Sequence, residues 1–442
     1  MKTYERYKPS GVEWIGDIPE HWRMSRLKFV LSQNDGGVWG DDWDGMDENA
    51  TKVFRSTEIN LDGSWNVDEA PELRLLSKQE KNKAQLIEGD LLVTKSSGSQ
   101  LHIGKTALVT SEIEKQECCY SNFTQRLRPL HKESSRYLHI FLNSNLAREQ
   151  YNFLSNSTTG LANLSAGLIS EILVPTPDLQ EQTAIAKYLD EKTAQIDKLI
   201  AGKRRLIALL KEERSGVINN AVTRGINPHA KLKPSGVDWL GEIPTHWEVK
   251  KLKWVCQITD CKHTTPIYIE IGIPVVSTGN VKPKQISFES ARKVSQRDFE
   301  ELSEGGRKPV KNDIIYSRNA SVGAAALVRS EEEFCLGQDI CLIRSNQNQE
   351  FLENVLNGSY VSAQLESVLV GSTFRRINIQ QIKEFEVALP SAQEQVSIVE
   401  FIEAETGKID ATVAKIEKEI EYLREYRTAL ISEVVTGKIK VV

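Results

Sequence analysis

Two long stretches of the chain, 178–223 and 391–436, repeat apolar residues at alternating steps of three and four, with charged residues between them. The apolar positions of the first stretch are Ile185, Leu189, Ile196, Leu199, Leu206 and Leu210. Those of the second are Ile398, Ile402, Ile409, Ile416, Ile420, Leu423 and Leu430. This narrow stripe is typical of a coiled-coil seam, which needs a partner helix. We predict two long helices that pack on one another.

Each stretch opens with a pattern for a helix N-terminus. Asp178 is followed three residues later by Glu181, and Ser391 is followed by Glu394. An N-cap oxygen and an N3 carboxylate together satisfy free amide donors of a first helical turn. We therefore predict a capping box at the start of both helices.

The segments that precede the helices are copies of one another. Residues 7–30 and 232–255 align at a constant offset of 225 and share fourteen identical residues. The offset falls to 213 at the helix starts, where the Pro-x-x-x-Glu-Gln pattern at 177–182 matches 390–395. The first middle section is thus 12 residues longer than the second. This internal duplication predicts that the ends of the two halves share one role while the middles have different ones.

Short apolar runs bounded by Gly, Asn and Asp predict strands in each middle section. These runs are Leu91–Thr94, Thr106–Thr110, Gln125–Leu130, Ile314–Ser317, Ala324–Arg329 and Ile340–Arg344. One helix is predicted after them in each half, at about 136–154 and 350–368, followed by a polar loop and a last strand. Each half is then a compact α/β globule with mixed strands.

The repeat also predicts the topology. Residues 232–255 leave directly from the C-terminal end of the first long helix, so residues 7–30 should lie at the C-terminal end of the second. The chain termini would then be close, and the helices antiparallel. The predicted fold is α+β, with two pseudo-symmetric mixed α/β domains separated by a coiled coil of two long antiparallel helices. The predicted boundaries are 1–177, 178–224, 225–390 and 391–442.

Composition adds limits to this architecture. The chain has 442 residues and a net charge of −5, which argues against unspecific coating of nucleic acid but allows a local basic groove. No run approaches the roughly 18 apolar residues that span a bilayer, so we expect a cytoplasmic protein without a membrane partner. The six cysteines have no CxxC spacing. Buried free thiols are therefore expected rather than a zinc site or disulfides.

An IPxHW opening, a variable middle and a P-x-x-x-EQ-x-x-I helix start occur twice in the chain. This arrangement resembles the specificity subunit of type I restriction-modification enzymes, and the resemblance covers essentially the whole chain. It implies that each globule is a target-recognition domain reading one half of an asymmetric split site in double-stranded DNA. It also implies that the helices hold the domains apart and bind two methyltransferase subunits, to which restriction/translocase subunits attach.

The resemblance implies that adenine N6 methylation takes place in the partners. S-adenosylmethionine, ATP and Mg would be bound there, with no cofactor in this chain. The residues agree with a non-catalytic role, because the chain has no Pro-Pro for a base-flipping methyltransferase site. The run 98–106 is one residue too long for a phosphate loop. The alternatives are a free-standing nuclease or methyltransferase with an unrecognised active site, and a coiled-coil scaffold without a DNA role.

Polar loops and strand ends in the two middles are the candidate DNA contacts, because forked side chains read base edges while hydroxyls and cations fix phosphates. In the first half they are Trp39, Arg55, Ser56, Thr57, Lys95, Ser96, Ser97, Thr158, Thr159, Gly160 and Asn163. In the second half they are Lys262, His263, Thr264, Thr265, Arg318, Asn319, Ser372, Thr373, Arg375, Arg376 and Asn378. For each of them, the plainer interpretation is a solvated loop or a surface strand end.

The aromatic and histidine residues of the opening segments have a different expected role. Trp14, His21 and Trp22, with their copies in the second half, lie in the shared ends rather than the divergent middles. We therefore expect them to pack against helix ends or partner subunits rather than to take part in catalysis.

Overall fold

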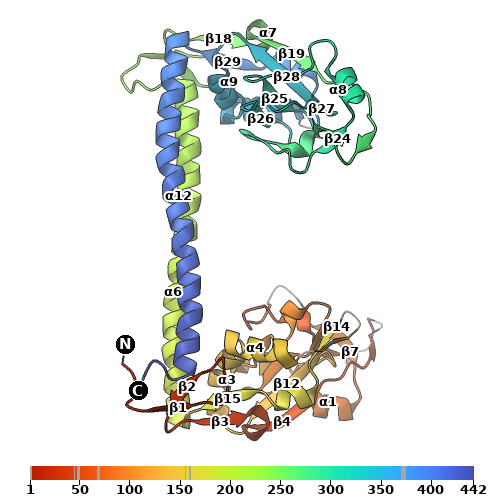
Figure 1. Cartoon of the computed structure of the whole chain (residues 1–442), viewed down its shortest axis with the longest axis vertical. Helices are drawn as coiled ribbons and strands as arrows, with labels where there is room; N and C mark the ends of the chain where they lie inside the picture. Colours follow the sequence, from red (N-terminus) through yellow and green to blue (C-terminus); the bar gives the residue numbers. More distant parts are fainter. Residues whose placement is uncertain are drawn as a thin grey trace. The chain divides into compact units, whose positions relative to one another are not determined.

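The computed structural model describes residues 2–43, 45–46, 50–66, 70–154, 156–158, 161–369 and 375–442. The chain forms two compact units. The first unit is Met1–Lys203 with Lys418–Val442, and the second is Arg204–Glu417. Each unit contains one α/β globule and a part of each long helix (Figure 1). In the part of the chain that the structure describes, no helix is long and apolar enough to cross a membrane.

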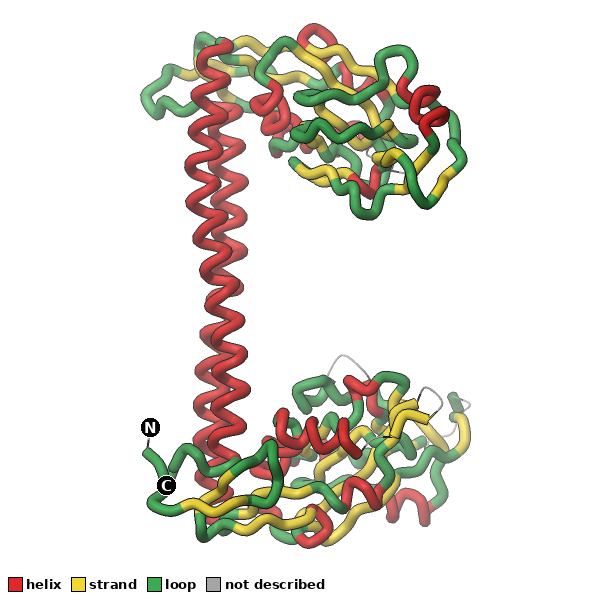
Figure 2. The backbone as a smooth tube through the Cα atoms, viewed as in Figure 1, coloured by secondary structure: helices red, strands yellow, loops and turns green. Residues whose placement is uncertain are grey.

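The two predicted long helices are present. Helix α6 spans Leu179–Arg224 and helix α12 spans Ala392–Val435, so each boundary lies within one residue of its prediction. In Figure 2 the two helices run side by side in each unit.

Ion pairs give the relative direction of the two helices. In the first unit, Arg427 Nε lies 3.1 Å from Asp197 Oδ1, and further along α6 Lys203 pairs with Glu419, which is earlier in α12. In the second unit, Arg214 Nε lies 2.9 Å from Asp410 Oδ1, and a Cβ added to Gly225, just past α6, would lie 3.5 Å from Glu394 Oε1 in the first turn of α12. Residue numbers therefore rise along α6 where they fall along α12. The predicted antiparallel packing is confirmed within each unit.

The apolar seam of α12 is the predicted one, but that of α6 differs at two positions. Leu199 and Leu206 are exposed, whereas Ile200 is buried and Ile207 is partly buried. Steps of four and three from the buried Ile196 reach 200, 203 and 207, which keeps these positions on one face. The prediction of Leu199 and Leu206 as seam residues was wrong, because it counted a step of three where the seam takes four.

The starts of both helices have only half of the predicted capping box. Asp178 Oδ1 accepts a hydrogen bond from Glu181 N at 2.8 Å, and Ser391 Oγ accepts one from Glu394 N at 3.3 Å. The N-cap prediction is thus confirmed. The glutamate carboxylates bind elsewhere.

Both glutamates bind the His-Trp pair of the opening segment. Trp22 Nε1 donates to Glu181 Oε2 at 2.9 Å, and Trp247 Nε1 donates to Glu394 Oε1 at 3.1 Å. The histidine before each tryptophan lies 3.2 and 3.0 Å from the same carboxylate. The two repeated motifs of each half, IPxHW and Pro-x-x-x-Glu-Gln, are therefore the two sides of one contact, in which the Trp–Glu bond is buried in the first unit and partly buried in the second.

The opening segments pack where the end of one long helix meets the start of the other. A Cβ added to Gly437, just past α12, would lie 3.2 Å from the ring of Trp22, and one added to Gly225, just past α6, would lie 3.3 Å from the ring of Trp247. Both glycines have a positive φ, +73° and +74°, as expected for a residue that ends a helix. The amide of Lys440 donates to the carbonyl of Lys2 at 2.8 Å. The predicted placement of residues 7–30 and the predicted proximity of the termini are confirmed (Figure 1).

Each globule has a central four-stranded sheet in which all neighbours are antiparallel. In the first unit its order is β10 (Thr106–Leu108), β8 (Leu91–Thr94), β12 (Thr124–Pro129), β4 (Leu31–Gly36). In the second unit it is β19 (Cys256–Asp260), β28 (Ile340–Ser345), β25 (Ile314–Ser317), β26 (Ala325–Leu327). These sheets confirm the six predicted strands.

A second four-stranded sheet in each unit contains one parallel pair, which makes the strands mixed, as predicted. Its order in the first unit is β11 (Cys119–Tyr120), β6 (Thr51–Phe54), β7 (Glu72–Leu75), β5 (Asp41–Asp42). In the second unit it is β20 (Tyr268–Ile269), β24 (Arg292–Val294), β21 (Ile273–Val276), β27 (Cys335–Leu336). The last strand of each globule pairs with the opening segment: β15 (Leu173–Thr176) with β3 (Arg23–Arg26), and β29 (Glu386–Leu389) with β18 (Glu248–Lys251).

Smaller elements connect these sheets. In the first unit they are β1 (Tyr7–Pro9), β2 (Asp17–Pro19), α1 (Lys78–Ala84), β9 (Ser96–Ser97), α2 (Ser111–Glu114), β13 (Asn156–Thr158), β14 (Leu161–Asn163) and α5 (Ala166–Ser170). In the second unit they are β16 (Leu232–Pro234), β17 (Glu242–Pro244), α7 (Leu252–Val255), β22 (Val281–Lys282), β23 (Gln285–Ile286), α8 (Gln296–Ser303) and α11 (Ile379–Lys383). The 3₁₀ turns are η1 (Leu27–Phe29), η2 (Ser56–Glu58), η3 (Gln100–His102), η4 (Lys132–Ser134) and η5 (Thr278–Asn280).

The single helix predicted in each middle is two helices. They are α3 (Ser135–Leu142) and α4 (Asn145–Leu154) in the first unit, and α9 (Gln349–Leu356) and α10 (Ser359–Leu369) in the second. An asparagine at each break bonds the edge strand of the central sheet. Asn143 Nδ2 donates to Thr106 O at 2.8 Å, and Asn357 Nδ2 donates to Ala325 O at 2.9 Å. This contact between helix and sheet outweighs the local helical pattern, and it was not visible in the periodicity.

Candidate nucleic-acid interface

In the second unit, three strands of the central sheet meet at one end and bring several predicted contacts together. Asp260, the last residue of β19, pairs in register with Cys341 of β28, and Ser317, the last residue of β25, pairs with Ile340. The predicted contacts at 262–265 follow the first of these strand ends directly, and Arg318 and Asn319 follow the second.

Asp260 holds two of these side chains. Arg318 NH2 lies 2.5 Å from Asp260 Oδ1, and His263 Nε2 lies 3.2 Å from Asp260 Oδ2. The guanidinium of Arg318 is buried, whereas the imidazole of His263 is exposed. Arg318 therefore stabilises the loop after β19 from its buried side, whereas the imidazole of His263 on the same loop faces solvent.

Asp339, immediately before β28, holds two more. Arg376 NH2 lies 2.6 Å from Asp339 Oδ1, and Asn319 Nδ2 donates to Asp339 Oδ2 at 3.1 Å. Asn319 and Arg376 also form a β-bridge, and Arg376 is exposed. A carboxylate that fixes both a guanidinium and an amide gives the two forked groups a defined orientation. We name this constellation the second-unit cluster: Asp260, His263, Arg318, Asn319, Asp339 and Arg376.

Other predicted residues of the second unit make contacts of their own. Lys262 Nζ lies 2.9 Å from Glu304 Oε2, and the bond to Glu304 raises the pKa of this ammonium. Thr265 Oγ1 accepts a hydrogen bond from Gln338 Nε2 at 3.0 Å, and the neighbouring Thr264 is exposed.

The predicted loop that precedes α11 is described only from Arg375 onward. Arg375 pairs with Glu366 on α10, and Asn378 Oδ1 caps α11 by accepting from Gln381 N at 2.9 Å. Ser372 and Thr373 lie outside the described residues.

In the first unit, pairing of small strands brings two predicted segments together. Lys95 follows β8, and the next two residues form β9, in which Ser96 pairs with Asn163 and Ser97 with Ala162 of β14. Strand β14 in turn pairs with β13. The polar loop predicted to end at Asn163 is therefore partly a strand, because its residues Ala162 and Asn163 pair with β9. Thr159 and Gly160 lie outside the described residues, as does the side chain of Thr158.

The first unit also places an aspartate next to the end of its first core strand, since Asp35 is the last residue but one of β4. Asp35 Oδ2 accepts from Arg126 NH2 at 2.8 Å, and Arg126 is buried. Lys95 Nζ lies 3.4 Å from Gln125 Oε1, and partial burial lowers the pKa of the Lys95 ammonium. Asp35 and Asp260 are 225 residues apart, as are the other copies in the repeat. The sequence prediction missed Asp35, Asp260 and Asp339. The first two are identical residues at matching positions of the repeat, and this match was a sequence signal that could have identified them.

The remaining predicted contacts of the first half have internal partners. Arg55 NH2 lies 2.7 Å from Glu58 Oε1, and Thr57 Oγ1 donates to the same oxygen at 2.8 Å. The carbonyl of Ser56 accepts from Lys105 Nζ at 2.8 Å. The ring of Trp39 packs on the core of the second sheet and lies under the guanidinium of Arg74. The residues from Arg55 to Thr57 thus build a turn around a buried carboxylate.

The profile of the Type I restriction modification DNA specificity domain matches residues 47–208 and 244–422, which is more than half of the chain. The chain belongs to the family of type I restriction-modification specificity subunits. It is 24% identical to the putative type I restriction enzyme MjaX specificity subunit of Methanocaldococcus jannaschii, over 97% of this chain and 96% of the relative. It is 23% identical to the type I restriction enzyme EcoKI specificity subunit of Escherichia coli, over 96% of this chain and 90% of the relative.

Solved structures share the fold of this specificity subunit. One comes from a study of complex assembly and conformational transition of the type I R-M system, with a TM-score of 0.69, 16% identity, and coverage of 96% of this chain and 99% of that one. Another is the HsdS subunit from Thermoanaerobacter tengcongensis, with a TM-score of 0.57, 16% identity, and coverage of 96% and 98%.

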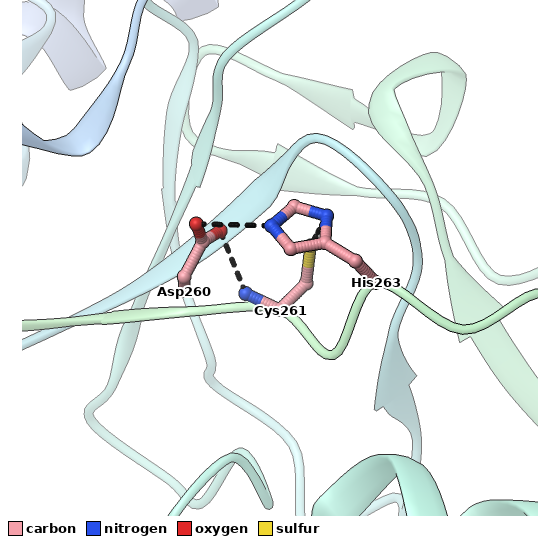
Figure 3. A group of neighbouring side chains, drawn as sticks. All are labelled: Asp260, Cys261 and His263. Atoms are coloured by element: carbon pink, nitrogen blue, oxygen red, sulfur yellow. Dashed lines mark hydrogen bonds and ion pairs between the residues drawn. The ribbon is translucent and has the colours of Figure 1, made fainter.

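Three side chains of the second-unit loop come close enough to suggest a metal site. Asp260, Cys261 and His263 offer ligand atoms within 4.8 Å of one another (Figure 3). However, NH2 of Arg318 lies 2.5 Å from Asp260 Oδ1 and 3.9 Å from Cys261 Sγ. The buried guanidinium of Arg318 therefore already binds the two side chains that would ligate a metal ion. Burial and then Asp260 raise the pKa of the Cys261 thiol, whereas a metal needs the thiolate. Asp260 and Cys261 instead orient the imidazole of His263 by hydrogen bonds.

The thiols of this specificity subunit are expected to react slowly in the native state. Burial raises the pKa of Cys118 and Cys335 to about 12, and that of Cys119 and Cys256 to about 11. A thiol with a pKa of about 11 is ionised to about one part in a thousand at pH 8, and the thiolate is the reactive form. With an aromatic disulfide reagent at pH 8, we expect reaction at least ~100-fold slower in the native chain than in guanidinium, where all six thiols titrate. A fast-reacting thiol in the native chain would contradict this; Cys256→Ser tests the one that is only partly buried.

Proposed function

We propose that this chain is the DNA-reading subunit of a type I restriction-modification complex and that each unit reads one half of an asymmetric split target. The observation that supports the proposal is that the two units share one fold but differ in the polar side chains at the end of the central sheet. Both units have an aspartate at or next to the end of the first core strand that binds a buried arginine, yet that arginine lies in β12 in the first unit and directly follows β25 in the second. Such a pattern is expected of two domains that bind the same kind of ligand and read different sequences from it.

In the second unit, the exposed donors of the second-unit cluster are the proposed base contacts. Arg376 can donate two hydrogen bonds to guanine, and Asn319 can donate and accept with adenine. Their shared partner Asp339 limits the freedom of both side chains before DNA is bound. His263, held by Asp260, adds a donor or acceptor next to them. Thr264, Thr265 and Lys262 are proposed phosphate contacts.

In the first unit, the proposed contacts are Lys95, Ser96, Ser97 and Asn163. They come from two segments that the β9–β14 pairing joins. Hydroxyls and an ammonium suit phosphate oxygens, and the exposed amide of Asn163 suits a base edge. A small sheet positions these groups more rigidly than an open loop would.

The remaining roles follow from the duplicated architecture. We propose that the long helices set the length of the unread gap and recruit two adenine-N6 methyltransferase subunits, through which restriction subunits join. In this proposal the chain is non-catalytic, and S-adenosylmethionine, ATP and Mg are bound by its partners. Its support is the second copy of the opening segment and of the helix start, since two like surfaces suit two like partners.

Exchange of one middle section tests the proposal. A chimera in which residues 31–176 come from another specificity subunit is expected to change one half of the methylated motif and to leave the other half unchanged. The shared ends and both helices remain, so the partners still bind. The measurement is a map of N6-methyladenine in DNA from cells that carry the chimera.

The reciprocal exchange is the matched control. Replacement of residues 256–389 should change only the other half of the motif. A single exchange that altered both halves would contradict a modular reader.

A further inference from the structure

Phe123 is an exposed aromatic residue at the end of the central sheet where the proposed DNA contacts of the first unit lie. It directly precedes β12, and it is 51% exposed. Its carbonyl accepts hydrogen bonds from the amides of Lys95 at 3.1 Å and Ser96 at 3.3 Å. Two of the proposed contacts are therefore bonded to the residue that carries this ring, although the sequence prediction did not include Phe123.

The turn that carries Phe123 is fixed at both of its ends. The amide of Thr124 donates to Ser121 O at 3.0 Å, and Thr124 Oγ1 donates to the same carbonyl at 2.8 Å. The amide of Ser121 donates at 2.8 Å to the carbonyl of Phe54, the last residue of β6. An exposed ring on a turn of this kind is positioned before a ligand arrives, so less conformational entropy is lost on binding.

The matching position in the second unit is Asp339. Phe123 directly precedes β12, and Asp339 directly precedes β28. The amide of Arg318 donates to Asp339 O at 2.8 Å, as the amide of Lys95 donates to Phe123 O. The two units therefore place different chemistry at one point of the same fold. The first has an aromatic ring there, and the second has the carboxylate that orients two donors of the second-unit cluster.

An apolar ring at this position suits one feature of a base edge. In the major groove, adenine, guanine and cytosine present hydrogen-bonding groups, whereas thymine also presents its C5-methyl group. Contact between this methyl group and an aromatic ring removes apolar surface of both from water. Phosphate oxygens are instead bound by cations and hydroxyls, which the neighbouring Lys95 and Ser96 supply.

We infer that Phe123 reads a thymine in the first half-site through the C5-methyl group of that base. This inference rests on the proposed function, and it names a base-reading residue together with the group that it reads. At the matching position of the second unit, the donors held by Asp339 read hydrogen-bonding groups instead. The two units thus differ in the kind of contact that they make at one position of a shared fold.

Replacement of thymine by uracil tests the inference, because it removes the methyl group and leaves base pairing unchanged. The proposed target has an adenine for methylation in each half, so the first half-site contains at least one thymine. The probe is the complex of this chain with its methyltransferase subunits, titrated with duplexes that carry uracil at one thymine at a time. We expect one replacement in the first half-site to weaken binding by wild type by roughly 3- to 10-fold. In Phe123→Ala the same replacement should have no effect, and Phe123→Leu, which keeps an apolar side chain, should retain part of the discrimination.

Two controls belong to this test. Leu130→Ala removes a side chain that is 54% exposed and lies just past the other end of β12, and it should discriminate thymine from uracil like wild type. Uracil in the second half-site should have the same effect on wild type and on Phe123→Ala. Retained reading of the second half-site also shows that the variant is folded and assembled.

The outcomes separate this inference from the proposed function. If the wild-type complex did not prefer its methylated motif to an unrelated duplex, the proposed function itself would fail. If wild type preferred the motif but bound every uracil duplex of the first half-site as tightly as the thymine duplex, only the role of Phe123 would be refuted. A uracil effect that persisted in Phe123→Ala would assign the methyl contact to another residue and would also overturn the inference. So would a Phe123-dependent rise in the fluorescence of 2-aminopurine in the first half-site without a uracil effect, because it would make the ring a wedge between bases.

Discussion

A Trp22→Ala variant is expected to lose about 4 kcal/mol of stability in the first unit, while Trp14→Ala is expected to change it by less than about 0.5 kcal/mol. Both tryptophans belong to the same repeated segment, but Trp22 is 0% exposed and Trp14 is 42% exposed. Removing the indole of Trp22 leaves a cavity where two helix ends meet. It also takes a donor from the buried carboxylate of Glu181, which then loses part of its hydrogen bonding.

Amide hydrogen exchange in native conditions is the measurement, because the chain has two units and a single unfolding curve would mix them. Trp22→Ala should accelerate exchange in the first unit. The matched control, Trp247→Ala, should do so in the second unit, since Trp247 is equally buried and binds Glu394. An equal effect of Trp14→Ala and Trp22→Ala would contradict the assignment of a structural role to one and a surface role to the other.

An Arg376→Ala variant is expected to weaken binding of the target by roughly 10- to 100-fold and to relax the base preference in one half-site only. The guanidinium of Arg376 is exposed and is held by Asp339, which also orients Asn319. Its loss removes a bidentate donor and leaves Asp339 without its cation, so a negative charge would then face the DNA. The measurement is the affinity of the complex with methyltransferase subunits for duplexes that carry each base substitution in the methylated motif.

Arg375→Ala is the matched control for this prediction, because it removes the same charge from the neighbouring position. Arg375 pairs with Glu366 on α10, so we expect a nearly uniform, smaller loss of affinity across sequences and a lower salt dependence. Equal relaxation of specificity by both variants would contradict the role of the Asp339 contact. An unchanged base preference after Arg376→Ala would remove this residue from the base contacts.

The elements that could be predicted were those whose signal lies within a short stretch of chain. Strands β8 and β25 match their predicted ranges, and the long helices match within a residue, because their patterns are continuous and strongly periodic. The predicted helix in each middle failed at Asn143 and Asn357. There the side-chain amide bonds a strand more than thirty residues away in the chain, and no local pattern reports such a contact.

The candidate site shows the same division. Residue types and the repeat indicated which segments carry polar groups, but the partners of those groups depend on which strand ends meet. Arg318 and Arg376 looked alike in the sequence. The sheet buries Arg318 against Asp260 and leaves Arg376 exposed beside Asp339, because Arg318 directly follows a core strand whereas Arg376 joins that strand end through a bridge to Asn319.

By itself, the sequence determined the duplication, the two long helices, their antiparallel pairing and the resemblance to specificity subunits, because identity at a fixed offset and a seven-residue period are properties of the chain alone. Only the tertiary structure decided that Glu181 and Glu394 bind the tryptophans of the opening segments and that Ile200 rather than Leu199 is buried on α6. It also decided that several candidate contacts of the second unit gather around Asp260 and Asp339. The physical reason is that a buried carboxylate or a forked side chain takes the partner that packing brings within about 3 Å, and that partner is set by the fold rather than by distance along the chain.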